Sequence, residues 1–212
     1  MGTPDATKVA VLEGKVTGAI FVAPTTVPLP TDAVTPLPKE YKCIGFTSED
    51  GVVISEDSSN NELRAWEGRA IVRNQKTEYK EQVTYTPIEC NEEVARATWG
   101  DGMVSVDDNG NLTIKHHGQT MEPVHSVIEA VPYANAVARY CAKTQLAERG
   151  DQTANGEDNG GRELTFDCLA NKEGVTMTEY IAVTAVSTPE TASATPEATP
   201  AKAETASAKG AK

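Results

Sequence analysis

Branched and aromatic residues recur along this chain in short stretches that are separated by turn residues. The clearest stretch, residues 69–90, reads RAIVRNQKTEYKEQVTYTPIEC and predicts two strands joined near Gln75–Thr77. In the second strand Tyr79, Val83 and Tyr85 fall on one face, and polar residues fill most of the other. This alternation is typical of a half-exposed antiparallel sheet.

The other strand-like stretches are short, and loops rich in Gly, Asn, Asp and Pro join them. Asn109-Gly110 is the strongest sequence signal for a tight hairpin turn. Many short strands at such spacing predict a mainly β fold, a β-sandwich or a barrel-like domain. The expected strands are 8–22 (in two pieces), 41–47, 52–55, 103–106, 112–115, 124–131, 135–146, 162–170 and 175–186.

One short helix is expected over about residues 91–99. Asn91 is a favourable N-cap, and Glu92 and Glu93 occupy the first turn, where the helix dipole favours acidic side chains. Gly100 is well suited to end the helix.

Several segments of the expected folded domain, residues 1–186, are predicted to lack regular structure. The proline-rich arm holds five prolines, which exclude a helix, and it is expected to lie extended on its own surface or on a neighbour's. The segments are the N-terminal arm 1–7, the proline-rich arm 23–38 and the long loops 47–62 and 150–161, with turns at 48–51 and a polar loop at 56–61.

The composition changes after Val186. Residues 187–212 contain no aromatic or large aliphatic side chain. Such a segment buries too little apolar surface to offset the entropy cost of ordering, so a disordered C-terminal tail is predicted.

Charge narrows the range of functions. The chain has 19 basic and 31 acidic residues, a formal net charge of −12. Residues 187–212 hold three Glu and three Lys, so the whole acidic excess lies in residues 1–186. Proteins that grip nucleic acid place Lys and Arg against the phosphates, which disfavours that function here. Simple solubility is the plainer interpretation of the charge.

Targeting signals are not expected. No apolar run reaches the ~18 residues that a membrane-spanning helix requires, so no membrane association is predicted. The first ten residues contain no apolar signal-peptide core, which favours synthesis in a cytoplasm.

The four cysteines, Cys43, Cys90, Cys141 and Cys168, are widely separated and form no CxxC pair. A zinc ribbon is therefore not expected. Reduced, buried thiols are favoured over two disulfides, because cytoplasmic proteins rarely hold structural disulfides.

The histidines do not predict a metal site. His116 and His117 are adjacent, so on a strand their side chains point to opposite faces, and His125 lies further along the chain. No GxSxG, P-loop or dinucleotide-binding motif occurs. We therefore expect no enzyme activity, no metal and no cofactor, and a metal-dependent hydrolase is the weakest alternative.

Four segments follow one another along the chain: GAIFVAPTTVPLPTDAVTPLP (18–38), YKCIGFTSEDGV (41–52), LRAWEG (63–68) and IECNEEVARATWGDGMV (88–104). Together they resemble major tail tube proteins of siphophages, the bacteriophages with long non-contractile tails. Their order and spacing match that family over about residues 8–186. One departure lies after Ala138, where the family often carries R-x-x-x-P and this chain has no proline.

The resemblance implies a structural virion protein that assembles in the host bacterial cytoplasm into hexameric rings, which stack into the virion tail. Its partners would be further copies of itself, the tape-measure protein in the lumen, and tail terminator and baseplate proteins. DNA would pass through at ejection without specific binding. The alternative function is an extracellular or capsid-decorating β-sandwich binding module.

The resemblance also implies two sets of site residues. Glu78 and Glu81, on opposite faces of one strand, are candidates for an acidic lumen that repels phosphate. The candidate subunit-interface residues come from the arms and loops: Pro24, Pro28, Pro30, Tyr41, Asp50, Glu56, Asp57 and Trp66.

Overall fold

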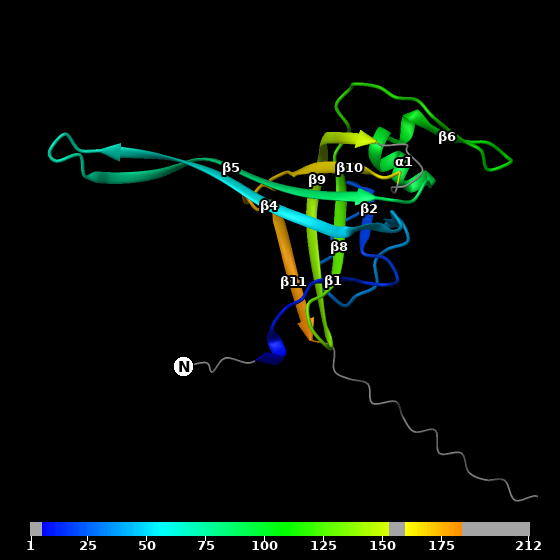
Figure 1. Ribbon diagram of the computed structural model, residues 1–212, viewed down its shortest axis with the longest axis horizontal. Coiled ribbons are helices and arrows are strands. Elements are labelled where there is room, and N and C mark those ends of the chain that lie inside the picture. Colours follow the sequence, from blue (N-terminus) through cyan, green and yellow to red (C-terminus); the bar gives the residue numbers. More distant parts are fainter. Residues whose placement is uncertain (1–5, 153–159, 184–212) are drawn as a thin grey trace, which may run out of the picture.

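The computed structural model describes residues 6–152 and 160–183 (Figure 1). Within these residues the chain forms a nine-stranded antiparallel sheet, a separate two-stranded hairpin and one α-helix. The prediction of a mainly β protein with one short helix is confirmed. The start of the N-terminal arm, the centre of the predicted 150–161 loop and the predicted C-terminal tail lie outside the described residues.

The elements are named in chain order. They are η1 (Ala6–Lys8), β1 (Glu13–Gly14), β2 (Ile20–Pro24), β3 (Lys42–Cys43), β4 (Thr47–Arg64), β5 (Ile71–Pro87), α1 (Glu92–Trp99), η2 (Asp101–Met103), β6 (Val104–Val106), β7 (Leu112–Ile114), β8 (Val124–Val131), β9 (Ala136–Gln152), β10 (Arg162–Cys168) and β11 (Met177–Val183).

Strand β9 organises the sheet. One edge pairs with β8, and the other pairs first with β11 and then, beyond Lys143, with β10. The sheet therefore forks along β9, and β5 and β4 continue from the β10 branch. Register shifts between β9 and β10 mark bulges, which bend strands and increase their twist. In Figure 1, β4 and β5 consequently run across the direction of β8, β9 and β11.

The main core lies between the β2–β8–β9 part of the sheet and the β10–β5 part. Side chains from β2, β5, β8, β9 and β10 pack there with Ile44, and the rings of Tyr85 and Phe166 stack with centroids 5.4 Å apart. The inward face of β5 is the one predicted from its alternation: Val83 and Tyr85 are buried, and Gln82 and Thr84 are half-buried. Burial of this kind of apolar surface is the dominant favourable term in folding.

The proline-rich segment, residues 23–38, folds back on its own sheet. Ala23 and Tyr41 pack with Val127 and Cys141 in a second buried cluster, and Val27, Leu29 and Leu37 cover it. The guanidinium of buried Arg139 donates hydrogen bonds to the carbonyl oxygens of Asp32 (2.8 Å) and Thr35 (2.9 Å). The segment was expected to lie either on its own subunit or on a neighbouring one, and in the structure it lies on its own subunit.

Helix α1 begins and ends where the sequence predicts. The side-chain oxygen of Asn91 accepts the backbone N–H of Val94 at 2.8 Å, as an N-cap does. Gly100 follows with a φ of 87°, a conformation in which side chains are strained. The helix packs beside the short β6–β7 hairpin, whose strands were also predicted.

The interpretation of residues 47–90 is corrected by the structure. The expected loop 47–62, with its turn at 48–51 and its polar stretch at 56–61, lies within strand β4. The expected turn at Gln75–Thr77 lies inside strand β5, and the chain reverses instead over residues 65–70. Arg69, with a φ of 55°, and Gly68 adopt the left-handed conformation that the tight turn needs.

Two shorter corrections concern strand ends. The strand expected over 41–47 is reduced to Lys42–Cys43, because Gly45 turns the chain with a φ of 91°. The 150–161 loop begins later than expected, since β9 continues to Gln152.

Candidate assembly surfaces

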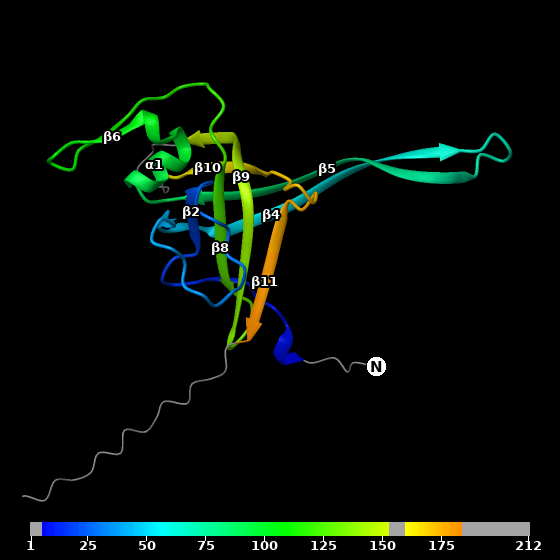
Figure 2. The same cartoon turned by 180° about the vertical axis from the view of Figure 1, so that it is seen from behind.

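The outer parts of β4 and β5 form a long two-stranded projection (Figures 1 and 2). We call residues 55–80 the hairpin extension. Apart from half-buried Ala65, every residue in it is exposed. A two-stranded hairpin with no core beneath it is marginally stable in water. We therefore expect this projection to be stabilised by contact with another protein surface.

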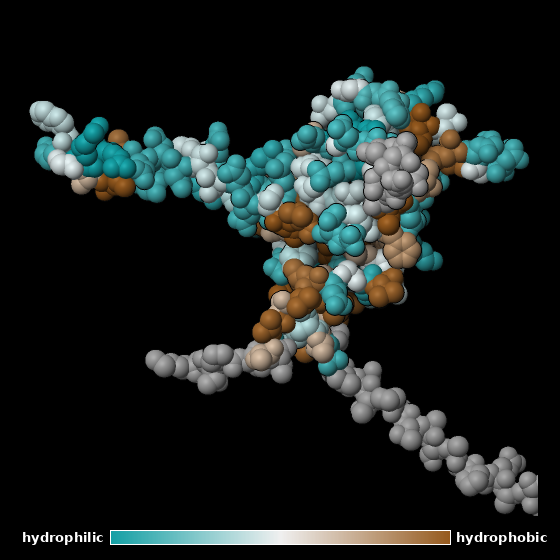
Figure 3. All heavy atoms as spheres, in the orientation of Figure 1, coloured by the Kyte–Doolittle hydropathy of each residue, from teal (hydrophilic) through white to brown (hydrophobic). Residues whose placement is uncertain are grey.

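Near its tip the extension carries a few exposed apolar side chains among mostly polar ones (Figure 3). Trp66 lies in the turn and is 94% exposed, and Leu63, Ile71 and Val72 are more than half exposed. Tryptophan is enriched among residues that carry the energy of protein–protein contacts. Exposed apolar groups of this kind mark interaction sites.

The tip is also basic. Between residues 62 and 76 there are two acidic residues, Glu62 and Glu67, and four basic ones, a net charge of +2. Arg64 is paired with Glu62. Among the described residues Arg69 and Arg73 have no ion-pair partner.

The sheet leaves strand edges open as well. In the described part of the chain β11 pairs only with β9, and β4 pairs only with β5. Ile181 and Val183 are exposed on β11. An unpaired strand edge is a template for pairing with another chain.

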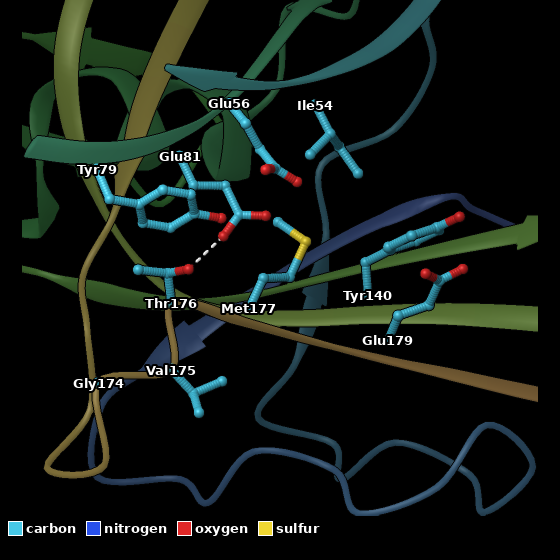
Figure 4. A pocket seen from close by; sticks show the side chains of 10 residues that line it. All are labelled: Ile54, Glu56, Tyr79, Glu81, Tyr140, Gly174, Val175, Thr176, Met177 and Glu179. Atoms are coloured by element: carbon cyan, nitrogen blue, oxygen red, sulfur yellow. Dashed lines mark hydrogen bonds between the residues drawn. The ribbon is translucent and has the colours of Figure 1, made fainter. Parts of the chain in front are cut away.

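An acidic hollow of about 450 Å³ lies where β4, β5, β9 and the start of β11 meet (Figure 4). Glu81 is 7% exposed there, and its carboxylate accepts the hydroxyl of Thr176. Glu56 and Glu179 line the same hollow (Figure 4). Burial, with the neighbouring Glu179 carboxylate, raises the pKa of Tyr140 to about 12.

The two candidate lumen residues are therefore in different surroundings. Glu81 faces the hollow inside the subunit, whereas Glu78 is exposed on the hairpin extension. They do not share a surface, and in the subunit only Glu78 is freely accessible to solvent.

The candidate interface residues also differ in how exposed they are in the subunit. Tyr41 is 6% exposed and donates its hydroxyl to the carbonyl oxygen of Pro28 at 3.1 Å, so it holds the proline-rich segment within the subunit. Burial raises its pKa to about 12. Pro30 is half-buried in the same segment. The remaining candidates are exposed: Pro24, Pro28, Asp50, Glu56, Asp57 and Trp66.

The histidine rings make contacts within the fold. His116 stacks on Trp99 with ring centroids 3.8 Å apart, and a ring nitrogen of His117 lies 2.7 Å from the carbonyl oxygen of Trp99. His125 contacts the carbonyl oxygen of Val27 at 2.7 Å. The three rings thus hold α1 and the proline-rich segment in place.

All four cysteines are free thiols. Cys141 and Cys168 are buried as predicted, Cys43 is half-buried, and Cys90 is exposed, which corrects the expectation that all four are buried. Cys90 follows the last buried residue of β5 and lies before the helix cap, where the sheet no longer covers it.

These environments predict selective thiol labelling. Burial raises the pKa of Cys141 and of Cys168 to about 12, so neither supplies the reactive thiolate near pH 8. A short maleimide pulse on the unassembled protein should label Cys90 first, as read by mass spectrometry of peptides. Cys141 and Cys168 should react only after denaturant is added. Cys90→Ser should remove the fast phase, and fast labelling of Cys141 in the native protein would contradict this assignment.

Comparison with known proteins bears directly on these surfaces. The model of a family described as phage tail tube protein matches residues 9–200. The chain belongs to the phage tail tube protein family. No curated protein matches its sequence. Membership of the tail tube family gives the chain a structural role in the virion tail and implies self-assembly into a tube.

In a tail tube protein, the exposed hairpin extension and the open strand edges are suited to contacts between copies, since self-assembly requires such surfaces. Sequence reasoning selected Trp66 from the tip but missed Leu63, Arg69, Ile71 and Arg73. One sequence feature could have indicated this hairpin: polar runs of nearly equal length, residues 56–61 and 73–78, lie on either side of AWEG (65–68). In the described part of the chain no helix is both long enough and apolar enough to cross a membrane.

Proposed function

We propose that this tail tube protein forms hexameric rings that stack into the tube of a siphophage tail. The tube encloses the tape-measure protein during assembly, ends on terminator and baseplate proteins, and conducts DNA at ejection. Assembly takes place in the cytoplasm of the host bacterium. The protein catalyses no reaction.

The observation that carries this proposal is the hairpin extension, together with the family match over residues 9–200. The extension leaves the body on one side and carries an exposed apolar tip. A tip on one side and a receiving surface elsewhere give a heterologous contact, which closes into rings or continues as a helical stack. Open strand edges on β11 and β4 supply further contacts between neighbouring sheets.

The charge of the folded part suits a conduit. The acidic excess of residues 1–186 disfavours retention of DNA, because phosphates are repelled at each ring. Glu78 and Glu81 remain the proposed acidic lining. Glu81 would need its surroundings to open on assembly, whereas Glu78 is exposed already.

Electron microscopy of the purified protein tests the proposal. We expect rings with sixfold symmetry and tubes built from them. Monomers or small closed oligomers at all concentrations would instead favour a binding module. A reconstruction with a net basic lumen would overturn the conduit mechanism while leaving the tube intact.

A further inference from the structure

A second surface of the subunit is apolar and carries a charge opposite to that of the tip. A groove of about 620 Å³ lies between α1, the end of β2 and the start of β8. We call it the α1 groove. Its apolar wall includes Val22, Pro24, Ala97 and Pro123. Most of its accessible lining is apolar, as expected of a seat for an aromatic side chain.

Acidic side chains surround this apolar wall. Glu40, Glu93 and Glu122 line the groove, and within the described residues none of them has an ion-pair partner. Arg96 and Asp101 also line it but are paired with each other at 3.1 Å. Lys42 is the remaining cation, so the lining has four acidic and two basic residues and a net charge of −2.

The tip of the hairpin extension complements this surface. It presents Trp66 in the turn together with Arg69, and Arg73 follows on the returning strand; the net charge over residues 62–76 is +2. Docking it in the α1 groove would bury an apolar ring and bring unpaired charges of opposite sign together. Complementary charge fixes the partner and the register of such a contact.

A second apolar hollow among the described residues does not match the tip. It has a volume of about 540 Å³ and lies over the proline-rich segment. Its charged residues are Lys15, Lys39, Arg139 and Glu129, so it is net basic and would repel the tip. Charge therefore favours the α1 groove over this hollow, and the lining of the α1 groove is more apolar than that of the acidic hollow beside Glu81.

The placement of the two surfaces excludes contact within one subunit. The tip lies at the far end of the extension, and α1 lies on the opposite side of the body in both views (Figures 1 and 2). A tip that occupies an α1 groove must therefore belong to a second copy. The contact is head to tail, as rings and stacks require.

We propose that the tip of the hairpin extension, centred on Trp66, docks into the α1 groove of a neighbouring copy of this chain. The proposal rests on the proposed function, because it assigns one contact within the assembled tube. It names a partner surface for the tip and charged pairs that set it: Arg69 and Arg73 on one copy against Glu40 and Glu122 on the next.

A charge exchange tests the contact. The tip reversal R69E/R73E should reduce the fraction of protein that sediments as tubes at least tenfold. The groove reversal E40K/E122K should do the same, and both groove positions are exposed and off the helix, so folding is preserved. Combining the two reversals should restore tubes. The matched control combines the tip reversal with E148K/E173K, which makes the same charge change at exposed sites outside the groove and should not restore them.

A direct measurement accompanies the exchange. In a Cys90→Ser background, subunits carrying Glu67→Cys, which keeps Trp66, mixed with subunits carrying Glu122→Cys should form disulfide-linked dimers under mild oxidation. Rescue by the groove reversal together with this cross-link supports the docking. Tubes that form in every variant, or rescue by the control reversal, overturn it while the tube function stands. Failure of the unchanged protein to form tubes overturns the proposed function instead.

Discussion

Shortening the β4–β5 hairpin to its base is expected to abolish tube formation while leaving the subunit folded. The change replaces residues 59–78 by Asn-Gly, a pair that favours the tight turn of a two-residue hairpin. Ser58 and Tyr79 are directly opposed in the ladder, so the new turn closes without a change of register. The part of the hairpin that contributes to the core, from Val52 and Ile54 to Val83 and Tyr85, is retained.

The subunit should stay folded but fail to assemble, because the extension contributes surface for contacts and no core packing. Nearly all of its residues are exposed, so removing residues 59–78 removes no core packing from the subunit. It does remove Trp66 and the apolar residues around it, which are the side chains best suited to carry binding energy. Electron microscopy and sedimentation should show monomers, and circular dichroism should show a folded β protein with an unfolding midpoint similar to that of the parent.

The control keeps the length of the extension and its tip. Ser59→Thr changes one exposed strand residue to one of higher β propensity and should assemble as the parent does. If the shortened protein forms tubes as readily as the control, the extension has no part in assembly.

The elements that could be predicted from sequence are those whose signals are local. Helix α1 is capped by Asn91 and ended by Gly100, and both act within a few residues of the helix. The inner half of β5 shows the two-residue alternation because one face is buried and the other is half-exposed. The mainly β class follows from many such segments taken together.

The hairpin extension could not be predicted, because its strands are not held by burial. Both of its faces are exposed, so residues 56–61 and 73–78 show polar runs without alternation and resemble loops. What makes them strands is a ladder that runs from Glu56 opposite Glu81 to Arg64 opposite Ile71. Cross-strand pairing of this kind depends on register, which single-residue patterns do not carry.

The proline-rich segment was only half predictable for a related reason. Five prolines exclude a helix, and this follows from sequence alone. The partner that binds the segment to the subunit, Arg139, lies more than a hundred residues away in the chain. No local pattern connects the two.

Removing Arg139 is expected to produce the largest loss of subunit stability. Its side chain is 3% exposed and contacts the buried Glu129 through two nitrogen atoms, at 3.0 and 2.5 Å. It also donates to the carbonyl oxygens of Asp32 and Thr35. Arg139→Met should cost about 3–5 kcal/mol in the free energy of unfolding, because it leaves a buried carboxylate without its one buried cationic partner among the described residues.

The matched control removes the other cation. Lys15 contacts Glu129 at 2.7 Å, but its side chain is 41% exposed. Lys15→Met should therefore cost no more than about 1 kcal/mol, as exposed ion pairs do. Urea denaturation of the unassembled subunits measures both values. Equal losses of unfolding free energy in the two variants would show that the burial of Arg139 does not determine how much it stabilises the subunit.

The pH dependence of the free energy of unfolding gives a second, independent test of the network of Arg139, Glu129 and Lys15. Burial alone would raise the pKa of Glu129, but the hydrogen bonds from Lys15 and Arg139 outweigh it and hold that pKa below its ordinary value of 4.5. A lowered pKa contributes stability that is present above the unfolded value and is lost as the pH falls through the folded one.

The parent should therefore lose stability below about pH 4.5, as Glu129 takes up a proton and its bond to Arg139 weakens. In Arg139→Met the pKa of Glu129 should rise, because burial then opposes the charge with only Lys15 to offset it. The difference in unfolding free energy between parent and variant should thus shrink as the pH falls from 7 to 4. A difference that stays constant over this range would mean that Arg139 stabilises the subunit through the carbonyl oxygens of Asp32 and Thr35, and not through Glu129.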